Sequence, residues 1–407
     1  MAFSVPGGKN IAMPIIGMVA ALRTAATISN VPRIADVDAM LSVLSSLGAT
    51  VRWADGSHDV WLDASSISRD SLVLPFPLPN FRGAIYLSAV ALTCREGTFD
   101  IAVGGDKISD RTLFPHARAI RSFGHIVHSV DANRIRFSPG TDNGLDSFVL
   151  DDKGISASCL ALSLAMCRRG KTRIQRCSLE HEVSDFIGAL HCLGAKVYRK
   201  GRSVCISSRN LDLNHQRHHV IVPSDLITAG TALVSGLMRS EAVKLQMIGP
   251  AWRGAWLASI MAACGADVRW MPHGVIEATS APSRGFRVRT GFPPHLPADL
   301  QPLFTVLALR CPRTSILEDF VYSNRFDHVL CLASLGARIS RSRRKLTIRP
   351  SSLQGSVDVS SLGIREQAAV KIAELAYSVD IRGEDFRALW RGYERDSDLT
   401  KFTFGMT

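Results

Sequence analysis

The motif Gly7-Gly8-Lys9-Asn10, close to the start of the chain, has residue types that could bind an anion. An apolar run interrupted by Pro14 and Gly17 follows it, which fits a buried helix better than a leader peptide or a membrane span. The first N–H groups of a helix lack intrahelical partners and carry the positive end of its dipole. A lysine there adds a full charge, so the motif predicts an anion site where a helix begins.

A repeat of about 71 residues predicts the elements that must position such a site. Five segments share the pattern apolar-x-x-apolar-Gly-x-x-apolar, and their glycines are Gly48, Gly124, Gly194, Gly265 and Gly336. Each segment is typical of a helix end, a glycine with positive φ, and a following strand. A sixth glycine would fall near residue 407, so we expect six units, the last incomplete, in two domains that meet around Val220–Asp225.

Composition narrows the class of protein but does not identify what the protein binds. The 407 residues are 46% hydrophobic and 21% charged, which excludes a disordered chain. The formal charge of +12 fits a nucleic-acid surface, a membrane surface or a cavity for a multiply charged anion. Nine cysteines without a CxxC pair or a zinc spacing predict reduced thiols, a cytoplasmic location and no metal site.

Seven motifs spread along the chain resemble those of the enolpyruvyl transferases, and within them the branch that acts on UDP-N-acetylglucosamine more than the shikimate-pathway branch. The motifs are GGKNIAMPI (7–15), NVPRIADVDAML (30–41), VGGDKISDR (103–111), LEHEVSDF (179–186), LPADLQPLF (296–304), YSNRFDHV (322–329) and RGYER (391–395). The resemblance implies an α/β fold of two lobes, each an inside-out α/β barrel of three βαβαββ units. We expect the first lobe to span 9–221 and the second to span 1–8 together with 222–407.

The resemblance implies a reaction: the enolpyruvyl group of phosphoenolpyruvate moves to a hydroxyl of a uridine nucleotide such as UDP-N-acetylglucosamine, and phosphate is released by addition and elimination. Neither a metal nor a cofactor is expected. Phosphoenolpyruvate carries a phosphate and a carboxylate, two groups that arginine can bind bidentately. By their positions in the family motifs, the residues implied to bind it are Lys9, Asn10, Arg111, Arg365 and Arg391.

This chemistry needs a base near the acceptor hydroxyl and an acid near C3 of phosphoenolpyruvate. Asp299 matches the family residue placed at the hydroxyl, as the base or as the group that orients it. Asp106 stands in the loop position where family members usually carry cysteine; it could deliver the proton if burial or Asp110 raises its pKa. Lys9 and Arg391 complete the implied catalytic set.

The acceptor side departs from the family pattern. Phe114 stands where the family typically has an aspartate that contacts the uridine, and Arg365 follows Gly363-Ile364 without the family's aspartate. The first strands and the last helix and strand of the family are expected to be missing. By position, the residues implied to bind the acceptor are Arg82, Arg111, Phe114, His116, Ile155, Asp299, Val321 and Arg325.

Three functions stay open. The first is the transferase just described, with the sugar nucleotide of cell-wall (peptidoglycan) synthesis or another nucleotide or nucleoside of a specialised, antibiotic-like pathway as acceptor. The second is a catalytically weak paralogue that binds ligand. The third is nucleic-acid binding, prompted by the basic runs Arg168–Arg176 and Arg341–Lys345; basic runs on turns are usually solvated, so we expect no nucleic-acid or membrane partner, and a monomer.

The aspartate at position 106 generates a first prediction. Fosfomycin-type epoxides alkylate a thiol, and a carboxylate at that place removes the thiolate nucleophile. Incubation with fosfomycin is therefore expected to leave turnover unchanged over time. Time-dependent inactivation, with the added mass found by mass spectrometry in the loop that carries Asp106, would contradict this expectation.

Overall fold

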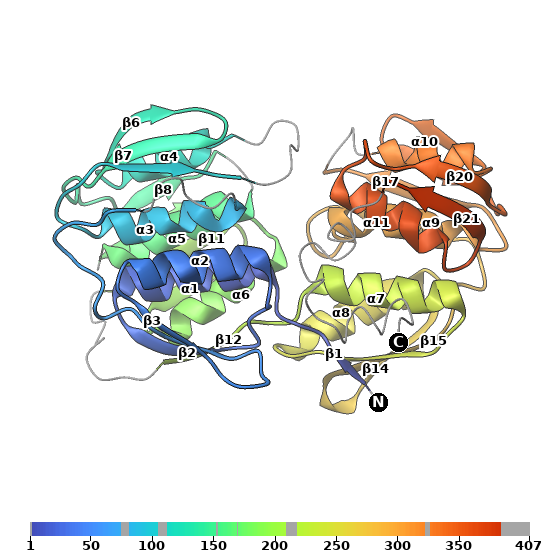
Figure 1. The fold of residues 1–407 in the computed structure, drawn as a ribbon, viewed down its shortest axis with the longest axis horizontal. Coiled ribbons are helices and arrows are strands. Elements are labelled where there is room, and N and C mark those ends of the chain that lie inside the picture. The colour runs from blue at the N-terminus through green and yellow to red at the C-terminus, as the bar shows by residue number, and fades with distance from the viewer. Residues whose placement is uncertain are drawn as a thin grey trace. The chain divides into compact units, whose positions relative to one another are not determined.

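The computed structural model describes residues 2–74, 81–104, 112–151, 154–168, 170–208, 218–321 and 326–383 of the chain. The chain forms two compact units, Gly7–Val222 in one, and Met1–Pro6 with Pro223–Thr407 in the other. In each unit, sheets cover a set of helices (Figure 1). The predicted α/β architecture is confirmed in this respect.

The repeated glycines end helices, as the sequence predicts. The five helices are α2 (Ala35–Ser46), α4 (Phe114–Ser122), α6 (His181–Cys192), α8 (Ala251–Ala263) and α10 (Asp327–Ser334). All five glycines that follow them have a positive φ, between 88° and 101°. After α2, the N–H of Gly48 donates to Ser45 O and that of Ala49 donates to Leu44 O, both at 3.0 Å, and the same pair of bonds recurs after the other four helices. The repeated motif is therefore a Schellman helix end.

Two repeats show the full βαβαββ order with all of their strands in one sheet. One consists of β8 (Ser147–Val149), α5 (Ile155–Cys167), β9 (Lys171–Gln175), α6, β10 (Lys196–Lys200) and β11 (Ser203–Ser207). The other consists of β16 (Arg287–Thr290), η3 (Ala298–Leu300) with α9 (Gln301–Leu309), β17 (Ser315–Asp319), α10, β18 (Ile339–Ser342) and β19 (Lys345–Ile348). Their sheets have equivalent strand orders, β10-β11-β9-β8 and β18-β19-β17-β16, with one parallel pair each.

In two further sheets, the edge strand is separated along the chain from the other strands by residues that belong to the other unit. In the unit 7–222, β12 (His218–Ile221) pairs in parallel with β2 (Ala25–Ser29), next to the hairpin β3 (Thr50–Trp53) and β4 (Val60–Asp63). In the other unit, β1 (Phe3–Ser4) pairs in parallel with β13 (Val243–Gln246), next to β14 (Asp267–Met271) and β15 (Val275–Ser280). The chain thus leaves one unit after β1 and returns to it after β12.

The remaining repeats are described in part. One contains η1 (Arg82–Tyr86), α3 (Leu87–Leu92), β5 (Phe99–Ala102), α4, β6 (Ile126–Val130) and β7 (Arg134–Ser138), and the other β20 (Gln354–Asp358), α11 (Ile364–Ala373) and β21 (Ser378–Arg382). The strands β5, β7 and β6 form one sheet, and β20 pairs in parallel with β21.

Each unit is built around three helices that pack on one another: α1 (Lys9–Leu22), α3 and α5 in one, and α7 (Leu226–Arg239), α9 and α11 in the other. All residues of α1 from Ile11 to Leu22 are buried, which confirms a buried helix beginning at Lys9. Such a helix is apolar on every side because it has neighbours on every side. Within the described residues, no helix is long and apolar enough to span a membrane.

Two arginines, the buried Arg23 and the partly buried Arg310, close the carboxyl ends of these helices, a role that the sequence interpretation missed. Arg23, 6% exposed, donates to the carbonyls of Ala21 and Val90, which belong to the last turns of α1 and α3. Arg310 donates from Nη1 to the carbonyl of Leu237, in the last turn of α7, at 2.9 Å. The last carbonyls of a helix lack intrahelical donors and carry a partial negative charge, so a cation there satisfies both needs.

The Schellman glycines generate a second prediction. Gly48 has φ +101°, a conformation that costs an L-residue about 1–2 kcal/mol, so Gly48→Ala is expected to lower the free energy of unfolding by that amount. Gly188, in the interior of α6, has open space where the Cβ of an alanine would stand, with no atom within 4 Å; Gly188→Ala should raise stability by up to about 1 kcal/mol. Urea unfolding followed by tryptophan fluorescence compares the two, and equal destabilisation by both variants would contradict the assignment.

Candidate functional site

The predicted site residues fall into three groups. Asp106, Arg111, Arg325 and Arg391 lie outside the described residues. Arg82 and Arg365 are described by their backbones only, at the start of η1 and in the first turn of α11. The others are described fully: Lys9, Asn10, Phe114, His116 and Ile155 in the unit 7–222, and Asp299 and Val321 in the other unit.

Most of these residues share one local position, the start of a helix. Lys9 is the first residue of α1, Phe114 of α4 and Ile155 of α5. The first turns of these three helices contain no acidic residue, and their N-cap residues make no side-chain capping hydrogen bond. The N–H groups of the first turns therefore keep the positive partial charge that favours an anion.

Packing brings the starts of these helices together in pairs. A Cβ on Gly83 of η1 would lie 2.1 Å from Met13 Sδ of α1, and one on Gly17 would lie 3.0 Å from Tyr86 Cβ. The earlier residue of α1 contacts the earlier residue of η1, and the later residue contacts the later one. The two segments therefore run in the same direction, and their first residues lie at the same end of the pair. The buried His116 of α4 lies 2.9 Å, Nε2 to Oγ, from Ser156 in the first turn of α5.

Lys9 is held by a residue that the sequence interpretation did not select. Its Nζ lies 3.1 Å from Oδ2 of Asp36, in the first turn of α2, and the two side chains are 22% and 28% exposed. Asp36 lies in the motif 30–41, which carried the resemblance but was assigned no role. The pair places the ammonium group at the start of α1 and leaves it half-buried, where its charge is screened less than at an open surface.

In the other unit, Asp299 lies in η3, directly before α9, and a buried polar cluster stands behind it. Gln301, Thr305 and His328 are each at most 1% exposed. Thr305 Oγ1 lies 3.2 Å from Gln301 Nε2 and 3.3 Å from His328 Nε2. Burial lowers the pKa of His328 to about 3, so the imidazole is neutral and can donate from Nε2. The cluster fixes the first turn of α9, and with it the segment that carries Asp299.

Val321 follows the end of β17 and is 37% exposed. Its N–H donates to Oδ1 of the buried Asp319 at 2.8 Å. Asp319 lies in register with Thr290 at the carboxyl ends of the parallel pair β16–β17. Ligands of α/β proteins commonly bind beyond the carboxyl ends of parallel strands. Thus Val321 and Asp299 occupy positions in this unit that suit a ligand, whereas Phe114, 56% exposed, presents an apolar ring at the start of α4.

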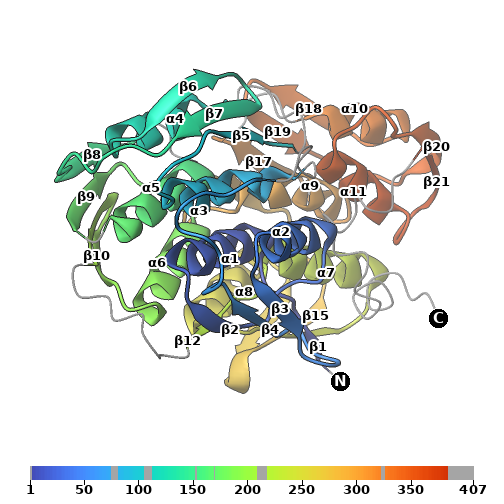
Figure 2. The same cartoon turned by 60° about the vertical axis from the view of Figure 1, so that its left-hand side comes forward.

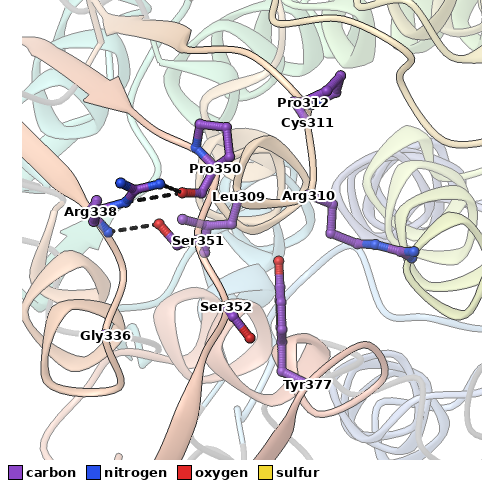
Figure 3. A pocket seen from close by; sticks show the side chains of 10 residues that line it. All are labelled: Leu309, Arg310, Cys311, Pro312, Gly336, Arg338, Pro350, Ser351, Ser352 and Tyr377. Atoms are coloured by element: carbon purple, nitrogen blue, oxygen red, sulfur yellow. Dashed lines mark hydrogen bonds between the residues drawn. The ribbon is translucent and has the colours of Figure 1, made fainter.

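A pocket of about 600 Å³ lies elsewhere (Figure 3). It is lined by Leu309, Arg310, Cys311, Pro312, Gly336, Arg338, Pro350, Ser351, Ser352 and Tyr377, none of which is a predicted site residue. Arg338 donates to the carbonyl of Pro350 and Arg310 to those of α7, so both guanidinium groups are already committed to the fold. The pocket lies at the carboxyl end of α9, opposite the end that follows Asp299. In the described part of the chain, no group of three or more His, Cys, Asp or Glu could hold a metal.

Comparisons with known proteins identify the family of the chain. The EPSP synthase (3-phosphoshikimate 1-carboxyvinyltransferase) family matches residues 2–398. The UDP-N-acetylglucosamine 1-carboxyvinyltransferase of Deinococcus radiodurans is 27% identical over 394 residues, 96% of this chain and 90% of that protein. That of Finegoldia magna is 28% identical over 411 residues, 98% of this chain and 93% of that protein.

Two solved structures share the fold. The enolpyruvyl transferase NikO from Streptomyces tendae has a TM-score of 0.81 at 19% identity and covers 99% of this chain and 94% of its own. An EPSP synthase from Acinetobacter baumannii has a TM-score of 0.72 at 16% identity, with 99% and 95% covered. These likenesses confirm the predicted two-lobed fold.

The cluster behind Asp299 generates a third prediction. The pKa of His328 is about 3 in the folded protein and near its ordinary value of 6.5 in the unfolded chain, so the unfolded chain alone takes up this proton as pH falls from 6.5. The contribution of His328 to stability is therefore present above pH 6.5 and is lost as pH falls toward 3. His328→Gln is expected to flatten the pH dependence of the free energy of unfolding, measured in urea between pH 7 and pH 4.

The matched control is His273→Asn, because His273 is exposed in the same unit and has φ +60°, which asparagine tolerates. This control should keep the slope of the parent protein. If His328→Gln keeps that slope too, His328 is not the group that resists protonation.

Proposed function

We propose a function for this chain from the family to which it belongs, the EPSP synthase (3-phosphoshikimate 1-carboxyvinyltransferase) family. As a member of that family the chain is a transferase, an enolpyruvyl transferase. The open question is the acceptor. Our proposal is that the chain transfers the enolpyruvyl group of phosphoenolpyruvate to a hydroxyl of a uridine nucleotide, in the first instance UDP-N-acetylglucosamine.

The near full-length match to carboxyvinyltransferases named for UDP-N-acetylglucosamine carries this proposal. With that acceptor, the enzyme would serve peptidoglycan synthesis in the cytoplasm. The nine cysteines, all free, fit a reducing compartment.

In the proposed mechanism, the start of α1 and Lys9 bind the anionic groups of phosphoenolpyruvate, together with Asn10, Arg111, Arg365 and Arg391. Lys9 is suited to this role because it stands on a helix start without acidic residues. Asp36 holds the ammonium group in place and shares it with the bound anion.

The bond changes follow from the substrate. The acceptor oxygen attacks C2 while C3 takes a proton, which gives a tetrahedral intermediate. C3 then loses a proton, the double bond between C2 and C3 re-forms, and the bond from C2 to the phosphate oxygen breaks. We assign the proton of the acceptor hydroxyl to Asp299 and the proton delivered to C3 to Asp106. The buried cluster behind η3 would keep Asp299 in the orientation that proton transfer needs.

One observation favours a different acceptor. Phe114 is 56% exposed at the start of α4, and an apolar ring cannot accept the hydrogen bond that an aspartate at this position would accept. The fold is also shared with NikO, a protein described as an enolpyruvyl transferase. A second candidate acceptor is therefore another nucleotide or nucleoside, one that is recognised at this position without a carboxylate. Such an acceptor would place the enzyme in a specialised pathway.

Phosphate release tests the proposal. The protein is incubated with phosphoenolpyruvate and, separately, UDP-N-acetylglucosamine, UDP, UMP and uridine. Release with UDP-N-acetylglucosamine supports the first acceptor, and release only with another compound supports the second. Absence of release with every acceptor, together with measurable binding by calorimetry, would instead support a weak paralogue that binds ligand.

The role of Asp299 gives the fourth prediction. Asp299→Ala should reduce kcat by at least about a hundredfold, the scale of a lost general base, while nucleotide binding stays measurable. Asp267→Ala, which removes an exposed carboxylate from β14 in the same unit, is the matched control and should keep the parent kcat. Unchanged turnover in Asp299→Ala would remove this residue from the mechanism.

A further inference from the structure

The sheet β10-β11-β9-β8 presents an unusual outer face. Its inner face is apolar, since Ile174, Val204 and Ile206 are buried against α5 and α6. On the outer face, four cations are exposed: Lys171 and Arg173 on β9, and Lys196 and Lys200 on β10. Figure 2 shows β8, β9 and β10 outside these two helices.

The strand between the two basic strands carries small side chains. The outward residues of β11 are Ser203, Cys205 and Ser207. They lie in register with the outward residues of β10 on one side, and Cys205 and Ser207 lie beside Arg173 and Lys171 on the other. Since neighbouring strands are about 4.8 Å apart, two rows of long cationic side chains about 10 Å apart flank a floor of short ones. We call this arrangement the basic channel.

Three other sheets pair outward cations with carboxylates on a neighbouring strand. Lys244 on β13 pairs with Glu277 on β15, Arg134 on β7 pairs with Asp100 on β5, and both Arg287 and Arg289 pair with Glu318 on β17. Such cross-strand pairs are the usual way in which a sheet balances its charges.

The four strands around the basic channel, all of them described, contain no aspartate or glutamate. Lys171, Arg173, Lys196 and Lys200 form no ion pair with any residue that the structure describes. Arg199 is the exception on β10, because it turns inward and donates to Ser184 and to the carbonyl of Ser178. The outward charge is thus left without internal compensation, which a polyanionic partner would supply.

We propose that the basic channel binds single-stranded nucleic acid, with the phosphate backbone along β11 between the two rows of cations. The aromatic ring of Tyr198 supports this choice of polyanion. Tyr198 is 68% exposed, stands between Lys196 and Lys200 on β10, and lies in register with Cys205 of the floor. An exposed ring beside a cationic track is the arrangement on which unpaired bases stack in proteins that bind single strands.

Two other polyanionic partners fit less well. A duplex is read by an element that enters a groove, whereas this face belongs to a four-stranded sheet and carries a track one strand wide. An anionic bilayer is bound by apolar side chains that insert beside the cations, and the channel floor carries Ser203, Cys205 and Ser207 instead. The sequence alone leads us to expect no nucleic-acid partner, because the basic run Arg168–Arg176 is expected to lie on a turn. Most of that run forms β9, which is one wall of the channel, and the other wall, β10, is distant from it in sequence. The inference does not depend on the transferase activity.

Fluorescence anisotropy with a labelled single-stranded RNA of about 12 nucleotides tests the proposal over a range of salt concentrations. Each phosphate contact contributes about 0.7 to the slope of log K against log salt, so Lys171→Gln combined with Lys196→Gln should lower the slope by about 1.4. Tyr198→Ala should weaken binding about tenfold through the loss of stacking.

A matched pair of variants controls for net charge. Arg52→Gln combined with Lys345→Gln removes two exposed cations from other sheets, β3 and β19, and should keep both the affinity and the slope of the parent protein. Phosphate release should be unchanged in all these variants, which separates failure of this inference from failure of the proposed function. Saturating phosphoenolpyruvate should leave RNA binding unchanged.

Three results would overturn the proposal. One is an equal loss of affinity in the channel variants and in the control pair, which would reduce the effect to net charge. Another is displacement of the RNA by phosphoenolpyruvate, which would place it in the substrate site. The third is binding to vesicles with anionic lipid that is stronger than binding to RNA and depends on Lys171 and Lys196, which would assign the channel to a membrane surface.

Discussion

The parallel pairing of β12 with β2 is the constraint on which the rest of the structure depends. The unit 7–222 begins at Gly7, and this pairing brings its last residues, 218–222, back beside its first strand, β2. Asn30 secures the return: its Nδ2 donates to the carbonyl of Val222 at 2.9 Å. A Cβ on Gly7 would lie 2.0 Å from the carbonyl oxygen of Asn30, so only glycine fits where the chain enters the unit. The entry and the exit of the chain therefore lie beside each other.

This constraint also places the anion-binding motif. Lys9 begins α1 two residues after Gly7, so the position of the chain entry determines where the start of α1 lies. Asn30 has φ +59°, a conformation that asparagine tolerates better than most residues. The residue that receives the returning strand is thus also the one that turns the chain after β2 toward α2, where Asp36 holds Lys9. The positions of Lys9 and Asp36 therefore follow from the way in which the chain enters and leaves the unit 7–222.

The sequence predicted the features that depend on local conformation. A helix that ends in a Schellman turn needs glycine at one position and apolar residues at fixed offsets, and both requirements are visible as a pattern around Gly48 and its four counterparts. The start of α1 at Lys9 was visible for the same reason. Contacts between residues distant in sequence could not be predicted in this way. No local pattern indicates that Arg23 donates to the carbonyl of Val90 or that Lys9 pairs with Asp36. Such contacts depend on how whole repeats pack, and the periodicity of one repeat does not encode them.

The distribution of charge follows from the same packing. Buried helices that run in one direction leave partial positive charges at one end and partial negative charges at the other. Arg23 and Arg310 compensate the negative ends from within the fold, whereas no acidic residue stands in the first turns of α1, α4 and α5. In the unit 7–222 the positive end of α1 is therefore left for an anion beside Lys9, whereas in the other unit Asp225 caps α7 and Glu366 stands in the first turn of α11. An excess of basic residues can therefore serve an anion site partly from a distance, by closing the opposite ends of the helices, and this part of the +12 charge needs no external partner.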